Sequence, residues 1–323
     1  MSAYWEQQRE RSTVAALRLM IWASLFFGRF IIRIVLWFIV AYFRLTSPVA
    51  VRASKNALRR LLQREPTWRD VMQHFYYFAG CVVDRLYLLK DTRHRFQIDV
   101  ARPDEVAELA ARGTGCLILM AHLGSFEPLR KLGTTQRKLP ITILMDRKQG
   151  QMLVNMLERI NPDFALQIID AAQRGPELML QLKEALQAGR MVCIMADRAR
   201  ADERALTVDF CGSPTRFPVG PWTLASALRV PVILGFGLYR GGRRYSAHFE
   251  LFSAQLDLPR QQRAAGLQDC VQRYAHRLEH YARLAPYNWF NFYDYWADDS
   301  PVNEITSPGT HHSISGNPPS DIP

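Results

Sequence analysis

Residues 19–43 form the feature that most constrains this chain. They read LMIWASLFFGRFIIRIVLWFIVAYF, a run interrupted by only four residues that are not clearly apolar, namely Ser24, Gly28, Arg29 and Arg33. A helix needs roughly 20 apolar residues to cross a bilayer, and this run has that length. No small-residue cleavage site follows it, so it does not resemble a removable signal peptide. We therefore predict a retained N-terminal membrane helix, with a buried core helix as the alternative.

Two arginines inside this run bear on how deeply it inserts. Arg29 and Arg33 are four residues apart and so share one face of a helix. Near the middle of a bilayer each would cost about 2.5 to 3.5 kcal/mol unless it reached the interface or found a partner. Basic residues flank the run on both sides, so the positive-inside rule gives no orientation. A helix half-inserted in the cytoplasmic leaflet is as consistent with the sequence as a full span.

The chain carries a formal net charge of +11, which suits an acidic partner. Nucleic acid, an anionic membrane face and an acidic carrier protein all fit that charge. The sequence contains no RNP-like aromatic motif and no zinc-finger spacing, and its basic residues are scattered. These observations disfavour nucleic acid as the partner.

The five cysteines are widely spaced, odd in number and set in apolar surroundings without a C-x-x-C pair. This usage is not typical of a disulfide framework or a zinc site. We predict reduced core thiols in a domain that faces the cytoplasm.

Apolar runs and helical patterns alternate through the middle of the chain. The predicted strands are residues 96–100, 116–121, 141–145, 166–169 and 191–196. The predicted helices between them are residues 103–112, 125–132, 149–160 and 176–188. Strands that alternate with helices of this length are typical of crossover units around a parallel sheet. We predict an α/β fold with a largely parallel central sheet flanked by helices, preceded by the membrane helix.

Further elements complete the predicted organisation. They are a helical region at 54–91, a strand at 206–210, a hairpin of strands 232–239 and 245–252 that turns at Gly241 and Gly242, and a long helix at 261–284. From residue 300 the chain is rich in Ser, Pro and Gly and lacks apolar periodicity, which predicts a disordered tail. The predicted division is a membrane anchor at 1–53, a catalytic domain at 54–299 and the tail at 300–323.

Polar residues follow consecutive strands of the predicted sheet. They are His122, Asp146 with Arg147, Asp170, and Asp197 with Arg198. Parallel strands bring such ends to one edge, where open α/β sheets bind ligands. Polar residues also follow strands wherever the chain returns to solvent, so the pattern alone leaves a purely structural role open.

His122 lies in the segment Ala-His-Leu-Gly-Ser-Phe-Glu, which ends at Glu127. On one continuous helix these two residues would face different ways, so they meet only if His122 precedes the helix. Gly124 permits a tight turn there, and Ser125 is suited to cap the helix. We predict that Glu127 orients the imidazole so that its other nitrogen takes a proton; a structural histidine is the alternative.

Other chemistries lack their motifs. The segment contains no H-E-x-x-H and no second histidine for zinc, and Ser125 is not part of a G-x-S-x-G elbow. The chain also has no G-x-G-x-x-G and no P-loop. We expect neither a metal nor a cofactor.

Three segments together resemble a known family. The His122 segment has the form H-x-G-x-x-E, residues 208–221 read VDFCGSPTRFPVGP, and residues 286–290 read PYNWF before a close that contains Trp296. In this order, and after an N-terminal apolar segment, they resemble the lipid A biosynthesis lauroyl/myristoyl acyltransferases, relatives of the glycerolipid acyltransferases. The resemblance covers about residues 15–297.

The resemblance implies an O-acyltransferase on the cytoplasmic face of a bacterial inner membrane. It implies transfer of a fatty acyl group from acyl carrier protein, or less often coenzyme A, to a hydroxyl of a membrane lipid or glycolipid. An acidic carrier protein is consistent with the charge of +11. Residues 54–299 would then be the acyltransferase domain.

Site roles follow by position. His122 would be the general base and Glu127 its partner. Arg147 and Asp197 match polar residues that follow later strands in the family, and Arg147 suits a phosphate or the developing oxyanion. Arg198 stands where Gln is frequent, which leaves the acceptor open.

Residues 217–227, which begin within the second matching segment, are candidates for the acyl-chain or acceptor site. Phe217, Gly220 and Trp222 are the predicted contacts, with core packing as the alternative. Two other functions stay open at this point: an inactive membrane-anchored protein that binds lipid or carrier, and a hydrolase of acyl thioesters.

Overall fold

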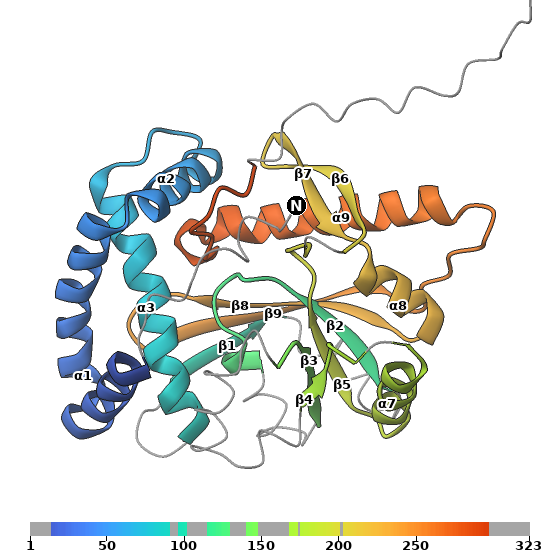
Figure 1. Cartoon of the computed structure of the whole chain (residues 1–323), viewed down its shortest axis with the longest axis horizontal. Helices are drawn as coiled ribbons and strands as arrows, with labels where there is room; N and C mark the ends of the chain where they lie inside the picture. The colour runs from blue at the N-terminus through green and yellow to red at the C-terminus, as the bar shows by residue number, and fades with distance from the viewer. Residues whose placement is uncertain are drawn as a thin grey trace, which may run out of the picture.

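The computed structural model describes residues 14–90, 96–101, 115–129, 140–147, 168–173, 175–200 and 203–296. A seven-stranded sheet lies at its centre, in the order β1-β9-β8-β2-β5-β3-β4 (Figure 1). Its strands are β1 Gln97–Ala101, β2 Cys116–Met120, β3 Ile141–Met145, β4 Ile168–Asp170, β5 Met191–Met195, β8 Val232–Tyr239 and β9 Arg244–Ser253.

Strand directions agree with the predicted fold class. Strands β8, β2, β5, β3 and β4 run parallel, whereas β9 is antiparallel to β8 and carries β1 alongside it. The predicted hairpin with its turn at Gly241 and Gly242 is the β8–β9 pair, and both glycines have positive φ. The mostly parallel α/β sheet flanked by helices is therefore confirmed.

The helices are α1 Val14–Thr46, α2 Pro48–Leu62, α3 Trp68–Lys90, α7 Pro176–Gln187, α8 Gly220–Leu228 and α9 Arg263–Leu284. The region predicted as helical from 54 to 91 is broken, because Gln63 ends α2 in the left-handed conformation with φ 54°. Helix α2 also runs through the predicted boundary at residue 53. The helices predicted at 103–112 and 149–160, and the tail at 300–323, lie outside the described residues.

The main core lies between the sheet and α9, with α8 and a small second sheet around them (Figure 1). This second sheet is a hairpin of β6 Ala205–Phe210 and β7 Ser213–Pro218. All five cysteines are buried and free, as predicted. Burial raises the pKa of the Cys116 and Cys211 thiols to about 12, so both stay protonated and unreactive at neutral pH.

Helix α1 contains a break at Gly28, whose φ of 77° lies outside the helical region. Beyond it, Ile32, Leu36 and Val40 are buried, and the first two pack with Val83 of α3. No helix among the described residues is, by itself, long and apolar enough to cross a membrane; the pair Gly28–Thr46 and Pro48–Leu62, bent by 100°, meets that criterion only together. The predicted N-terminal membrane helix is thus unconfirmed.

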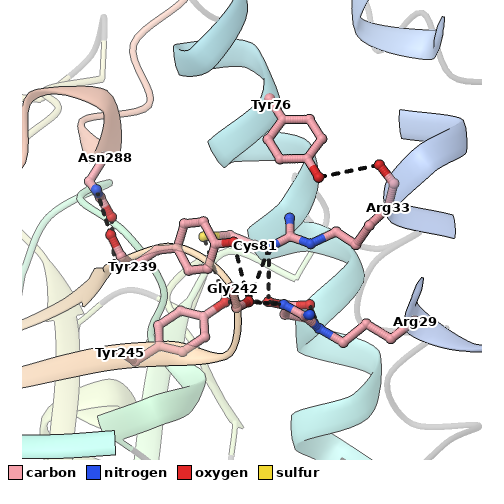
Figure 2. Close-up of polar contacts among 9 residues, drawn as sticks. Arg29, Arg33, Tyr76, Cys81, Tyr239, Gly242, Tyr245 and Asn288 are labelled. Atoms are coloured by element: carbon pink, nitrogen blue, oxygen red, sulfur yellow. Dashed lines mark hydrogen bonds and ion pairs between the residues drawn. The ribbon is translucent and has the colours of Figure 1, made fainter. Parts of the chain in front are cut away.

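A buried charge cluster joins α1 to α3 and the β8–β9 turn (Figure 2). Arg29 donates from Nε and Nη2 to the two oxygens of Asp84, at 2.7 and 2.8 Å. Tyr245 donates its hydroxyl to the same carboxylate at 2.9 Å, and Arg33 donates to the hydroxyl of Tyr239. The two arginines of the apolar run therefore face the domain and have found a partner there.

Asp84 is the only carboxylate in this cluster among the described residues, and its side chain is fully buried. We expect Asp84→Ala to lower the free energy of unfolding by about 3 to 5 kcal/mol, because two buried arginines lose their counter-charge. Urea titration of the detergent-solubilised chain measures this. Glu65→Ala, which breaks the exposed pair with Arg59, is the matched control and should change little. Equal effects of the two substitutions would contradict the assignment.

Candidate active site

His122 lies two residues beyond β2, in a loop held by backbone hydrogen bonds to two other segments. Phe290 donates its N–H to the carbonyl of His122 at 2.9 Å, and Gly124 donates to the carbonyl of Asn288 at 2.8 Å. On the other side Ser125 donates to the carbonyl of Gly237 in β8, at 2.7 Å. The loop is therefore clamped between the sheet and the segment that follows α9.

The partner of His122 is Asp197. Strands β2 and β5 are neighbours, and Met120 is paired with Met195, so the residues two positions further on lie side by side. Nδ1 of His122 lies 2.9 Å from Oδ1 of Asp197, and the backbone N–H of His122 donates to Oδ2 at 3.0 Å. Since an ionised carboxylate only accepts, Nδ1 carries the proton and Nε2 is the free basic nitrogen.

The surroundings keep Asp197 charged. Its side chain is fully buried, whereas that of His122 is 37% exposed. Burial opposes the charge, but the His122 imidazole and N–H, together with Arg198 at 4.0 Å, lower the pKa of Asp197 below its usual value. Tyr295 also donates its hydroxyl to the backbone carbonyl of Asp197. Asp197 is therefore a fixed anion bound at Nδ1 of His122, and the ring of His122 is partly exposed.

The predicted contact between His122 and Glu127 is wrong. One oxygen of Glu127 forms an ion pair with Nε of Arg85 in α3 at 2.5 Å, and the other accepts the Ser125 hydroxyl at 2.6 Å. Among the described contacts none joins Glu127 to the imidazole. Ser125 donates to Glu127 instead of capping the helix. The turn at Gly124 carries Glu127 to Arg85 of α3.

Arg198 and Arg147 occupy different places at the sheet edge. Arg198 donates from Nη2 to the carbonyl of Phe290 at 2.7 Å and lies over the ring of Tyr293, so it sits beside the His122 loop. The backbone N–H of Arg147, after β3, donates to Asp170, after β4, at 3.3 Å. The structure brings His122, Asp197 and Arg198 together, and places Arg147 further along the edge.

The three predicted substrate contacts differ in their surroundings. Phe217 and Trp222 are fully buried in the main core, where both pack against Tyr274. Gly220 is exposed at the start of α8, where an added Cβ would lie 2.7 Å from the Glu203 carboxylate. Phe217 and Trp222 serve as core residues in this structure. Their contact with a substrate stays a prediction.

The other two segments of the resemblance support the His122 loop through packing contacts. Cys211 and Gly212, with φ of 53° and 76°, form the tip of the β6–β7 hairpin. The hairpin brings Phe210 edge-on to Trp289, with ring centroids 5.1 Å apart. Trp289 in turn forms a β-bridge with Leu123. The aromatic packing therefore fixes the loop on which His122 lies.

The described residues contain no group of three or more His, Cys, Asp or Glu side chains placed to hold a metal ion. The chemistry that the site offers is that of an oriented imidazole with an arginine nearby. Such an arrangement suits proton transfer to and from an attacking hydroxyl.

The profile of the bacterial lipid A biosynthesis acyltransferases matches residues 19–297. The match covers most of the chain, so the protein belongs to this family of acyltransferases. The resemblance drawn from the three sequence segments is confirmed.

Curated relatives are also acyltransferases. The chain is 27% identical over 122 residues to a phosphatidylinositol mannoside acyltransferase of Mycobacterium tuberculosis, a match that covers 38% of each protein. It is 25% identical over 129 residues to the protein of that name in Mycolicibacterium smegmatis, covering 40% of this chain and 42% of the relative. The chain thus spans about two fifths of the length of these relatives.

Gly124 is required by two features of the loop. Its φ is +72°, and an added Cβ would lie 2.0 Å from the carbonyl oxygen of Gly237. We expect Gly124→Ala to destabilise the protein by on the order of 3 to 5 kcal/mol and to abolish transfer. The added Cβ would push the His122 loop away from the carbonyl of Gly237 in β8. Gly212→Ala is the control, since Gly212 has φ +76° but open space around it; it should cost roughly 1 to 2 kcal/mol. Thermal unfolding and activity of both variants decide between these outcomes.

A second histidine, His74, binds the segment after α9 that holds the His122 loop. His74 of α3 is fully buried, with Nε2 2.9 Å from the carbonyl of Trp289 and Nδ1 2.8 Å from the hydroxyl of Ser54. The carbonyl can only accept, so Nε2 carries the proton and Nδ1 accepts from the serine. Burial lowers the pKa of His74 to about 4.

This neutral histidine makes stability depend on pH. The unfolded chain binds a proton at His74 below about pH 6.5, whereas the folded chain does so only near pH 4, so stability falls as pH drops through that window. Between pH 7 and pH 5 the loss should be about 2 kcal/mol. Urea midpoints at both pH values measure it, and His74→Gln should remove this part of the pH dependence. An unchanged slope in the variant would assign the effect to other groups.

Proposed function

We propose that the protein transfers a fatty acyl group from a thioester to a hydroxyl of a membrane lipid or glycolipid, with His122 as the general base. The observation that carries this proposal is the hydrogen bond from Nδ1 of His122 to buried Asp197. It fixes the tautomer in which Nε2 is free to accept a proton. We therefore assign to Asp197 the role of orienting the imidazole, which the sequence had predicted for Glu127.

In the proposed reaction Nε2 of His122 removes the proton of the acceptor hydroxyl as its oxygen attacks the thioester carbonyl. The C–O bond forms and a tetrahedral oxyanion develops. The C–S bond then breaks, and the imidazolium returns its proton to the departing thiolate. Asp197 stabilises the imidazolium. Because the acceptor hydroxyl attacks the thioester directly, no covalent acyl-enzyme is needed.

Glu127 then has a positioning role. Its ion pair with Arg85 and its bond from Ser125 tie the loop to α3, and both oxygens are buried in that contact. A buried carboxylate with a bound guanidinium is expensive to break, so the loop is held at a fixed distance from α3. Glu127 acts on the reaction through the placement of His122.

Donor and acceptor are proposed from charge and family. Acyl carrier protein or coenzyme A would be the donor, and the net charge of +11 suits an acidic carrier. The names of the mycobacterial relatives make a phospholipid mannoside one candidate acceptor, beside a lipid A precursor. Arg198 and Arg147 are the proposed contacts for a phosphate or for the oxyanion. The proposed place of action is the cytoplasmic face of a bacterial inner membrane.

Incubation of the detergent-purified protein with labelled acyl carrier protein and a bacterial lipid extract tests the reaction. Label in a lipid supports the proposal. Label in free fatty acid would make the protein a thioester hydrolase, and unchanged donor would make it a binding protein. Repeating the assay with labelled acyl coenzyme A distinguishes the two donors.

The assignment of the base and its partner makes distinct predictions for three variants. His122→Ala and Asp197→Asn should each lower kcat by about 10²- to 10⁴-fold, because general base catalysis is lost or its tautomer is no longer enforced. Glu127→Gln should lower stability, because Arg85 loses its buried counter-charge. Wild-type rates in Asp197→Asn would refute the pairing.

A further inference from the structure

The face of α1 that turns away from the domain is apolar. Phe30, Phe38 and Leu45 are 77, 74 and 76% exposed. The other large apolar side chains exposed on this helix are Phe26, Ile31, Ile34, Val35, Trp37, Tyr42 and Phe43. Soluble monomers rarely expose a contiguous apolar surface of this size, and larger ones mark an interaction site.

The opposite face of α1 carries two buried arginines. Arg29 and Arg33 are 7 and 8% exposed and lie in the cluster around Asp84 (Figure 2). A surface helix in water has the reverse arrangement, with its apolar stripe inside and its charges outside. The distribution on α1 therefore suits a helix whose outer side meets lipid.

Gly80 of α3 leaves space for the side chain of Arg33. An added Cβ at Gly80 of α3 would lie 1.7 Å from Nη1 of Arg33, so the absence of a side chain there lets the guanidinium pass. The guanidinium lies over the rings of Tyr76 and Tyr239, and the hydroxyl of Tyr76 donates to the carbonyl of Arg33 at 3.2 Å. Backbone and side chain of α1 are thus both bound to the domain.

We propose that the segment Gly28–Thr46 lies in the plane of a phospholipid bilayer, with its outward face among the head groups and upper acyl chains and Arg29 and Arg33 kept in the protein. Crossing the bilayer would pull both arginines from Asp84 and place them in hydrocarbon, where a charged side chain is strongly disfavoured. Packing on α3 also leaves only one face of the helix for lipid. The inference extends the membrane attachment proposed above.

Two further observations favour a bilayer over a second copy of the chain. Arg52 and Lys55 are exposed on α2, directly after the bend, and suit anionic head groups. Trp37 and Tyr42 on α1 are 48 and 63% exposed, and such aromatic side chains are enriched at the membrane–water interface. Basic residues facing basic residues across a dimer would repel.

This placement also puts the bilayer near the active site. Helix α3 separates α1 from the sheet (Figure 1). Phe78 of α3 contacts Phe290, the residue whose N–H binds the carbonyl of His122, and Arg85 of α3 binds Glu127. On the proposed function, a hydroxyl carried by a membrane lipid approaches His122 past this helix.

Fluorescent labelling of single introduced cysteines tests the orientation, since the five native cysteines are all buried. The variants Phe30→Cys, Ile34→Cys, Phe38→Cys and Leu45→Cys of the full chain are labelled with an environment-sensitive dye and added to vesicles of phosphatidylethanolamine and phosphatidylglycerol. Leu180→Cys, at an exposed position of α7, is the control. Lipids with a spin label near the head group or near the chain end report depth.

An in-plane helix predicts similar blue shifts at all four positions and at least about two-fold stronger quenching by the head-group label than by the chain-end label. Strongest quenching of Ile34 and Phe38 by the chain-end label would show a crossing helix and overturn the proposal. A blue shift without vesicles that grows with protein concentration would show a dimer and also overturn it. Neither readout requires acyl transfer, so a failure here is distinct from a failure of the proposed reaction.

Charge on the outward face gives a second test. Phe38→Glu should weaken sedimentation with the same vesicles by at least about ten-fold, because a carboxylate enters the head-group boundary in place of a ring. Leu180→Glu, at an exposed position of α7, should sediment like the wild type. Equal sedimentation of the two variants would overturn the proposal.

Discussion

The parallel pairing of β2 with β5 is the interaction on which the rest of this structure depends. It sets Met120 opposite Met195, and the register then carries two more residues along each strand to His122 and Asp197. Because Asp197 is buried and bound by the His122 N–H as well as by Nδ1, the pair is part of the sheet edge and moves with it.

A second constraint is the clamp on the His122 loop. Residues after α9 return to this loop, and their backbone groups pair with His122 and Gly124. Trp289 is held there by Phe210 from the β6–β7 hairpin and by the buried His74 below it. The two family segments far from the active site in sequence therefore act by packing: they hold the backbone that presents the imidazole.

The Asp84 cluster connects these interior features to the surface of α1. Asp84 and Arg85 are consecutive residues of α3, yet Asp84 binds the arginines of α1 while Arg85 binds Glu127 of the loop. One turn of α3 thus carries both ion pairs, and it lies between the apolar face of α1 and the loop of His122. A buried ion pair is costly to separate, so this turn sets the distance between the two regions.

The sequence by itself determined the mostly parallel α/β sheet, the β8–β9 hairpin, the buried thiols, the family and the place of His122 just after a strand, because each is encoded in local pattern or in short motifs. It also identified Asp197 as a strand-end residue. Tertiary structure alone decided which carboxylate meets the imidazole: β5 follows β3 and β4 in the chain but inserts beside β2 in the sheet, and strand order depends on long-range packing. The same holds for Arg29 and Arg33, whose spacing shows a shared face, while only Asp84, some fifty residues away, shows that this face points inward.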